Sequence, residues 1–442
     1  MKNIKLSKLW DSLHSSYWFV PTMMAGFAIA LAFTMLTLDQ EEIPGLIKKL
    51  GWIYTGGPDG ARTVLSSVAS SMITVAGTAF SIVLVALSLA SSQFGPRILR
   101  NFMQDTGNQI VLGTFIATFI YCLLVLRTIR GGEQTIFVPQ ISVTVGIVLT
   151  MTSIGVLIYF IHHASTSIQS AHIIGDVGRD LNNAIERLFP EKIGRSFPEL
   201  TPRFAGEIPV GFDKEAAPIL ATHSGYIQAM DDEKLMNIAK SKDLLLRLNY
   251  RPGKYVVKGC ELMMVLPGQQ INEKLTKQIN NAFILGRERT DQQDVEFCIN
   301  QLVEVALRAI SPGINDPFTA IRCIDQLSAA FCRLAERDFP SPYRYDDAGN
   351  LRIIAESVTF TTLTDNAFNP IRQYGRSDVG VTIRLLEAIA LIASRTRNKK
   401  DRKALLRHAQ MIERGSHKEI SEECDRQDIE ERYLAVVKAL ES

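Results

Sequence analysis

Residues 64–94 read VLSSVASSMITVAGTAFSIVLVALSLASSQF, an uncharged run long enough to cross a lipid bilayer as a helix. Three further runs, at 17–38, 108–126 and 138–161, also lack charged residues. A bilayer core of about 30 Å needs about 20 apolar helical residues, and open backbone arrangements leave amides unsatisfied there. The sequence therefore predicts an α-helical membrane domain of four transmembrane helices over residues 17–163.

Charged residues are concentrated after residue 163, although the whole chain of 442 residues has a formal net charge of only +2. This change of composition predicts an α+β cytoplasmic region behind the membrane domain. We expect its parts in this order: a stalk helix at 164–189 that continues the fourth span unbroken to Pro190, a linker at 190–216, a small α+β module at 217–268 and a mainly α-helical domain at 269–442.

The orientation in the membrane depends on the first span. Loop lysines and arginines divide evenly between the two sides, so their count decides nothing. Residues 1–16 alternate lysines with apolar side chains, which predicts an amphipathic helix on the lipid headgroups. At the other end of the first span, Asp39 begins an acidic flank. We therefore expect both termini in the cytoplasm, where the six cysteines, which lack CxxC spacing, remain reduced.

A stripe of small hydroxyl side chains follows the second span at alternating steps of 4 and 3 residues, interrupted once by Val85. Its members are Ser67, Ser71, Thr74, Thr78, Ser81, Ser88 and Ser92. A 3.5-residue repeat keeps such a stripe on one side of the helix. Two interpretations remain open: the stripe packs closely against another helix, or copies of it line a water-filled path in a homo-oligomer. The spans contain no charged residue, which argues against an ion-coupled transporter but leaves a passive channel possible.

The soluble region begins with a module of short strands. Strands are expected at 223–230, 244–250, 255–257 and 260–266, with a helix at 232–240. This pattern resembles the half-barrels of biotinyl and lipoyl domains, so we expect a small β half-barrel-like module. The residues at the position of the modified lysine of those domains are Met263-Met264-Val265, so the resemblance implies a shared scaffold only.

Helical periodicity dominates the remainder, with one β-hairpin at 343–354. Helices are expected at 271–285, 294–310, 317–337, 361–374, 379–395, 401–414 and 421–440.

The most distinctive local sequence is RAISPGINDPFTAIR, residues 308–322. Pro312-Gly313 ends one helix, and Asp316 can cap the next, which starts at Pro317. A plain interhelical turn explains these features. The alternative is a polar motif, which would be a buried network or a site for an anionic group. Its residues are Arg308, Asn315, Asp316 and Arg322. The spacing from Asp316 to Arg322 recurs from Asp378 to Arg384, which suggests a duplicated helical hairpin.

Signatures of catalysis are missing from the sequence. We find no P-loop, Rossmann fingerprint, HExxH, GxSxG elbow or paired cysteine site, and no basic stripe with aromatic residues. His162, His163 and His172 lack partners at ligand spacing. We therefore expect no enzyme activity, no cofactor, no metal site and no nucleic-acid partner. The sequence does not indicate whether the soluble region binds a small ligand.

Seven segments carry a full-length resemblance: SSQFGPRILRNF, NQIVLGTFIATFIYCLLVLRTIR, SGYIQAMD, RPGKYVV, GRERTDQQD, SPGINDPFTAIRCID and IRQYGRSD. With these the chain resembles a bacterial family of predicted membrane proteins of unknown function that combine four N-terminal spans with this soluble region. The resemblance implies the bacterial inner (plasma) membrane. Our preferred hypothesis is an oligomeric ion channel or pore with a cytoplasmic gating and assembly domain. The alternative is a membrane-anchored regulatory, sensor or scaffold protein.

Overall fold

The computed structural model describes residues 18–40, 53–95, 105–132, 135–167, 169–189, 208–209 and 211–441. The chain divides into two compact units, Met1–His172 and Ile173–Ser442, and each is described by itself. The amphipathic segment expected at 1–16 and most of the linker expected at 190–216 lie outside the described residues.

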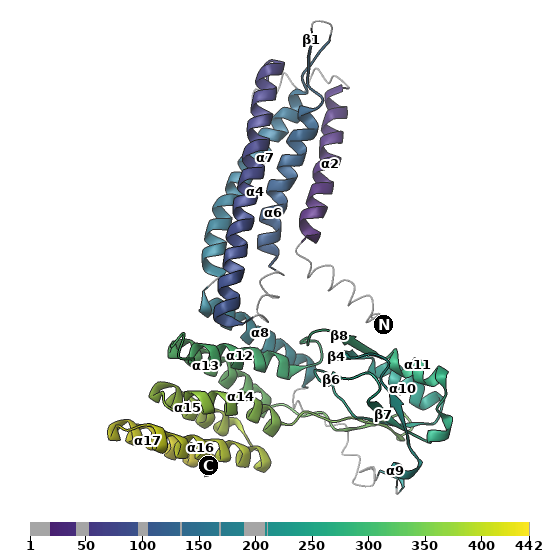
Figure 1. Ribbon diagram of the computed structural model, residues 1–442, viewed down its shortest axis with the longest axis vertical. Coiled ribbons are helices and arrows are strands. Elements are labelled where there is room, and N and C mark those ends of the chain that lie inside the picture. The colour runs from purple at the N-terminus through teal and green to yellow at the C-terminus, as the bar shows by residue number, and fades with distance from the viewer. Residues whose placement is uncertain are drawn as a thin grey trace. The chain divides into compact units, whose positions relative to one another are not determined.

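The first unit is a bundle of long apolar helices (Figure 1). These are α2 (Phe19–Gln40), α4 (Pro58–Phe94), α6 (Thr106–Leu126) and α7 (Gln140–Ser167). Within the described residues, four helices are long and apolar enough to span a membrane, with mean hydropathies of 1.9 to 2.2. The predicted helical membrane domain is therefore confirmed. An unpredicted hairpin of β1 (Arg130–Gly132) and β2 (Thr135–Phe137) joins α6 to α7.

Polar contacts and small residues hold this bundle together around α6, which packs against α2, α4 and α7. Thr118 on α6 and Ser153 on α7 share a hydrogen bond of 3.0 Å, and the Tyr121 hydroxyl donates to the Ser142 carbonyl at 3.0 Å. Such bonds stabilise helix association where apolar burial contributes little, because lipid is as apolar as the helices.

Asp39, at the end of α2, caps the first turn of α7. Its carboxylate accepts hydrogen bonds from the backbone amides of Ile141 and Ser142, both at 2.9 Å, and from the Ser142 hydroxyl at 2.6 Å. A carboxylate is favourable there because the first amides of a helix lack partners and the helix dipole is positive at that end. The residue that marks the acidic flank in the sequence therefore also joins two helices.

The expectation of an unbroken stalk is wrong. Helix α7 ends at Ser167, and α8 spans Ser170–Leu188. The Thr166 hydroxyl donates to the carbonyls of His162 and His163 at 3.1 and 3.0 Å, and the Gln169 amide donates to Thr166 in a tighter turn at 3.1 Å. Hydroxyl side chains that bond to nearby backbone groups compete with the helix ladder, which explains a break in this Ser- and Thr-rich segment.

The second unit contains, in its described part, a mixed five-stranded sheet and an antiparallel three-stranded sheet with short helices beside them. The elements are α9 (Phe212–Glu215), β3 (Ala217–Leu220), β4 (Gly225–Met230), α10 (Asp232–Ser241), β5 (Leu245–Leu248), β6 (Tyr255–Val256), β7 (Glu261–Leu266), α11 (Glu273–Asn280), β8 (Phe283–Gly286), β9 (Tyr343–Tyr345) and β10 (Leu351–Ile354). The strand orders are β3-β7-β5-β10-β9 and β6-β4-β8. Their shared core includes Leu235, Leu246, Met263, Val265 and Ile279.

The sheets recruit strands from beyond the module end predicted at residue 268. The helix predicted over 271–285 ends at Asn280, and Phe283–Gly286 forms β8 instead, paired antiparallel to β4. Strand β10 pairs in parallel with β5, so the hairpin at 343–354 belongs to the larger sheet. Whether FILG forms a helix or a strand depends on a pairing partner far away in the chain. Local periodicity contains no information about that partner.

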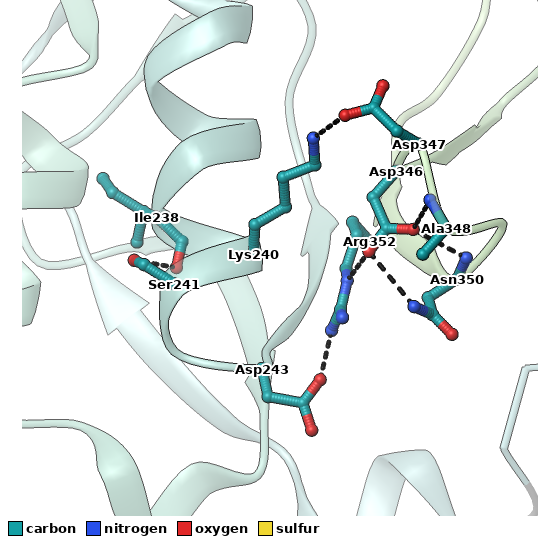
Figure 2. Close-up of polar contacts among 9 residues, drawn as sticks. All are labelled: Ile238, Lys240, Ser241, Asp243, Asp346, Asp347, Ala348, Asn350 and Arg352. Atoms are coloured by element: carbon teal, nitrogen blue, oxygen red, sulfur yellow. Dashed lines mark hydrogen bonds and ion pairs between the residues drawn. The ribbon is translucent and has the colours of Figure 1, made fainter.

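Ion pairs attach this hairpin to the module (Figure 2). Lys240, on α10, lies 2.5 Å from the Asp347 carboxylate. Arg352 bridges Asp243 at 2.5 Å and Asp346 at 2.7 Å. Asp346 also accepts hydrogen bonds from backbone amides of its own turn, so one carboxylate both shapes the turn and orients Arg352.

The C-terminal part is a stack of three helical hairpins (Figure 1). Its helices are α12 (Val295–Ala309), α13 (Pro317–Ala335), α14 (Phe360–Gly375), α15 (Val379–Arg395), α16 (Lys399–Glu419) and α17 (Glu423–Glu441). Helix α13 packs on α15 and α15 on α17, while α12 packs on α14 and α14 on α16. Such stacking of similar units is the geometry of helical repeat proteins.

The repeated spacing noted in the sequence occupies equivalent positions in this stack. Asp316 caps α13 by accepting from the Thr319 amide at 3.1 Å, and Asp378 caps α15 by accepting from the Val381 amide at 2.8 Å. Both helices are the second of their hairpins, in agreement with the suggested duplication.

Candidate functional site

The hydroxyl stripe of α4 faces away from the other helices of its unit. All its members and Val85 are exposed in the described structure. The opposite side of α4 carries a second stripe, which is buried. That stripe contains Ala61, Leu65, Ala69, Met72, Ala76, Ala79, Val83, Ala86 and Ala90, packed mainly against α6 and α7. The alanines, not the hydroxyls, therefore make the close helix packing within the chain.

Several hydroxyl protons of the stripe are used within α4 itself. Thr74 donates to the Ser70 carbonyl at 2.8 Å, Thr78 to the Thr74 carbonyl at 3.0 Å and Ser81 to the Gly77 carbonyl at 2.9 Å. A hydroxyl has one donor and two acceptor lone pairs, so back-bonding leaves an acceptor directed away from the helix. The stripe accordingly presents oxygen acceptors, the groups that water and cations contact.

Large apolar side chains flank the stripe on α4. Ile73, Phe80 and Leu84 are 47%, 42% and 50% exposed in the single chain. Their exposure suits contact with lipid or with another subunit, because monomeric soluble surfaces rarely gather such residues.

The polar motif around residue 315 is a capped turn rather than a buried network. Asn315 has a φ of 51°, a left-handed conformation that asparagine tolerates, and both it and Arg322 are exposed. Arg308 lies 3.6 Å from Glu304 on the same helix. The Asp316 carboxylate already occupies the N-terminus of α13, where it accepts from Thr319. Since Asn315 and Arg322 are exposed, the described contacts agree with the plain interhelical turn and not with a buried network, which was one of the alternatives; the anion site stays a prediction.

The three histidines lie near helix ends, and one of them contacts a carboxylate. His163 Nε2 lies 2.5 Å from Asp105 Oδ2, and Asp105 also caps α6 by accepting from the Gly107 amide. His162 and His172 are exposed. The part of the chain that the structure describes contains no cluster of three or more His, Cys, Asp or Glu side chains able to hold a metal ion.

Sequence reasoning missed a cavity inside the second unit, which we call the Arg251 cavity. It has a volume of about 390 Å³, within the range of small-molecule sites. Its apolar wall includes Phe189, Leu235, Met236, Leu248 and Val358. Its polar lining includes Asp232, Tyr250, Arg251, Gln293, Asp294, Arg344, Glu356 and Ser357.

Three of the segments that carry the family resemblance meet at this cavity. SGYIQAMD contributes Met230, RPGKYVV contributes Arg251, and GRERTDQQD contributes Gln293 and Asp294. The Gln293 amide holds the end of β4, since its Oε1 accepts from the Met230 amide at 2.8 Å and its Nε2 donates to the Met230 carbonyl at 3.0 Å. The sequence feature that could have indicated this cavity is the number of charged residues in segments that are not helical. Such charged segments are equally typical of solvated turns.

A buried cluster of charges contributes Arg251 and Asp294 to the lining of the Arg251 cavity. Arg251 Nη2 lies 2.8 Å from Glu296 Oε1, with side chains only 8% and 4% exposed. Arg289 Nη2 lies 2.7 Å from Asp294 Oδ2, and the Asn366 amide donates to Glu296 at 2.8 Å. Burial raises the pKa of Asp294, whereas the charge and hydrogen bond of Arg289 lower it. The paired charges cancel, as buried charges must if they are to remain ionised.

Two polar atoms of this cluster have no hydrogen-bond partner among the described residues. They are Nε of Arg251 and Oδ1 of Asp294, and both atoms are buried. Among the described residues, the ion pair at this Nε is a loose one of 3.9 Å to Glu356. Unsatisfied buried donors and acceptors are rare in folded proteins, so a pair of them beside one cavity calls for an explanation.

Comparison with known proteins identifies relatives but no solved structure. The family model described as "Predicted membrane protein (DUF2254)" matches residues 14–391. An uncharacterised protein of Mycobacterium bovis and one of Mycobacterium tuberculosis are each 34% identical to this chain over 425 residues, covering 94% of it and 79% of the relative. No solved structure matches, so the likeness of the module to biotinyl and lipoyl half-barrels stays a prediction.

Proposed function

Because the chain belongs to the DUF2254 family of predicted membrane proteins, we propose that it acts in the membrane itself, as an oligomeric ion channel or pore. In this proposal copies of α4 surround a central path in the bacterial inner membrane. Both termini lie in the cytoplasm, and the second unit assembles and gates the path.

One observation carries the proposal: the hydroxyl stripe of α4 is exposed along its length, opposite the alanine stripe that packs within the chain. A stripe of hydroxyls gains little from contact with lipid tails, and apolar side chains already flank it. In a closed ring of subunits the same stripe faces an axis, where its oxygen acceptors replace part of the hydration shell of an ion.

The hairpin stack of the second unit suits an assembly role. Repeat stacks present extended surfaces, and their end units are available to neighbours. Exposed apolar side chains at the 310–320 turn, Ile314 at 42% and Phe318 at 75%, supply a surface for contact between subunits.

Accessibility of single cysteines tests the pore. We would replace the less buried Cys260, Cys332 and Cys424 and keep the buried thiols, among them Cys298, whose pKa is raised by burial. Cysteines are then placed singly at Thr78 and at Leu84 in full-length protein in liposomes.

The proposal predicts that a water-soluble methanethiosulfonate reagent modifies the cysteine at Thr78 and reduces ion flux, while the cysteine at Leu84 does not react. Equal protection of both positions in protein that is folded and oligomeric would contradict a pore along α4. A bulky replacement, Ser88→Trp, should block current in the same preparation.

The alternative is a membrane-anchored regulatory, sensor or scaffold protein. The Arg251 cavity favours it, because a pocket of this size in a soluble unit is the ordinary place for a regulatory ligand. Absence of flux from correctly assembled protein, together with ligand binding in the cavity, would favour this alternative over the pore.

A further inference from the structure

We propose that the Arg251 cavity binds a neutral small molecule that joins an apolar ring or short chain to an amide-like edge, with a hydrogen-bond acceptor beside a donor. The inference is independent of whether α4 lines a pore. It concerns contacts within the second unit only.

The size and walls of the cavity set the apolar part of the ligand. A volume of about 390 Å³ accommodates a ring with substituents but not a large cofactor. Leu235 and Leu248 line it from the core of the module, and Val358 closes it from the segment before α14. An apolar body gains from leaving water in such surroundings.

The charges around the cavity argue against an anionic ligand. Its lining carries three carboxylates, Asp232, Asp294 and Glu356, against two guanidinium groups, Arg251 and Arg344. The positive charge of Arg251 is already compensated by Glu296 at 2.8 Å. Phosphate and carboxylate ligands normally need uncompensated arginines or lysines, so their recognition here would be weak.

The unsatisfied atoms set the polar part of the ligand. Within the described structure, Arg251 Nε is a donor without an acceptor, and Asp294 Oδ1 is an acceptor without a donor. The two side chains are 92% or more buried, being 8% and 2% exposed. A carboxamide or a lactam edge supplies one acceptor for the Arg251 donor and one donor for the Asp294 acceptor, and it adds no charge.

The neighbouring turn supports a site built around Asp294. Gly253 has a φ of 86°, and a Cβ atom at this position would overlap the Asp294 carboxylate. The RPGK turn and the Asp294 side chain are therefore fitted to each other, and Arg289 fixes the other carboxylate oxygen. Oδ1 is left as the free atom of a side chain that is otherwise held rigidly.

Benzamide and benzoate form a matched pair of probes, because they share the ring and differ in charge and in the donor. Saturation-transfer NMR with full-length protein in lipid nanodiscs measures the binding of each probe. The protein variants are Ser357→Trp, which fills the cavity from its lining, and Ser421→Trp, a control at an exposed serine outside it.

We expect a benzamide signal from the wild type and from Ser421→Trp, and no such signal from Ser357→Trp. Benzoate should bind the wild type at least about tenfold more weakly than benzamide, a factor that corresponds to roughly 1.4 kcal/mol. Arg251→Lys keeps the charge next to Glu296 but removes the guanidinium Nε, and should weaken benzamide binding with the fold retained; this variant decides the question if Ser357→Trp does not fold. Equal benzamide signals from all variants, or preference for benzoate, would overturn the proposal.

Discussion

The ion pair between Arg251 and Glu296 should be essential to the stability of the second unit, and Arg251→Met is the change that tests it. The substitution keeps a flexible apolar stem but removes the charge that faces Glu296 at 2.8 Å. Glu296 is 4% exposed, and its remaining hydrogen-bond partner among the described residues is the Asn366 amide at 2.8 Å.

The magnitude follows from burial. Removing one member of a buried ion pair costs about 3–5 kcal/mol, because the remaining charge loses its compensation. Arg289 Nη2 lies 3.9 Å from Glu296 Oε2 and offsets part of that loss, which places the expected cost near the lower limit. We therefore expect Arg251→Met to destabilise the unit by about 3 kcal/mol.

Amide hydrogen exchange in α12, which carries Glu296, measures this loss in the full-length protein. If exchange follows opening of the unit, a loss of about 3 kcal/mol accelerates it by about a hundredfold. The matched control is Arg333→Met, because Arg333 and Glu186 form an ion pair of 3.0 Å with side chains 50% and 56% exposed. Exposed pairs contribute about 0–1 kcal/mol, so this control should change exchange by less than about sixfold.

A double variant separates the charge from the packing. Arg251→Met combined with Glu296→Met removes both charges and should recover most of the stability, since apolar replacements of buried pairs are often neutral. Exchange in Arg251→Met no faster than in Arg333→Met, or a double variant less stable than Arg251→Met alone, would refute the reasoning.

Two further predictions concern the hairpin and the helix packing. The hydrogen bond from Arg352 and those from its own turn hold the pKa of Asp346 below the usual range. The pKa of Asp346 is lower in the folded chain than its unfolded value of about 4, so its stabilisation is present above pH 4 and is lost as the pH falls further. Amide hydrogen exchange of β9 and β10 should therefore accelerate below pH 4, and Asp346→Asn should remove this pH dependence. On α4, Ala79→Leu inserts a larger side chain into the buried stripe and should destabilise the bundle by about 1–3 kcal/mol in thermal unfolding. Thr78→Leu, one residue away on the exposed side, should leave the stability of the isolated chain nearly unchanged.

The features that could be predicted from the sequence are those that depend on neighbours in the chain. The four apolar spans follow from length and lack of charge, and helices such as Val379–Arg395 follow from periodicity and an aspartate cap. The failures are non-local. Residues 283–286 form a strand only because β4 lies beside them, and the hairpin at 343–354 joins the larger sheet only because β5 offers an edge.

The Arg251 cavity could not be predicted for the same reason. Its polar residues come from separate turns, with Arg251 before a Pro-Gly pair, Asp294 at the start of α12 and Arg344 in the hairpin. Each is ordinary in its local context, where a charged residue in a turn is usually solvated. Only the tertiary fold brings them around one cavity and buries two of their polar atoms.

The hydroxyl stripe shows the opposite case, in which the spacing was visible but its surroundings were not. Periodicity places Thr78 and Ser81 on one side of α4 and Ala76 and Ala79 on the other, and either side could have packed within the chain. The structure uses the alanine side for that packing. Packing among the described residues therefore does not explain the hydroxyls, and lipid tails would be met equally well by leucine or valine. The proposal sets two surroundings against each other, another copy of α4 and water, and these are the surroundings that cysteines at Thr78 and Leu84 distinguish.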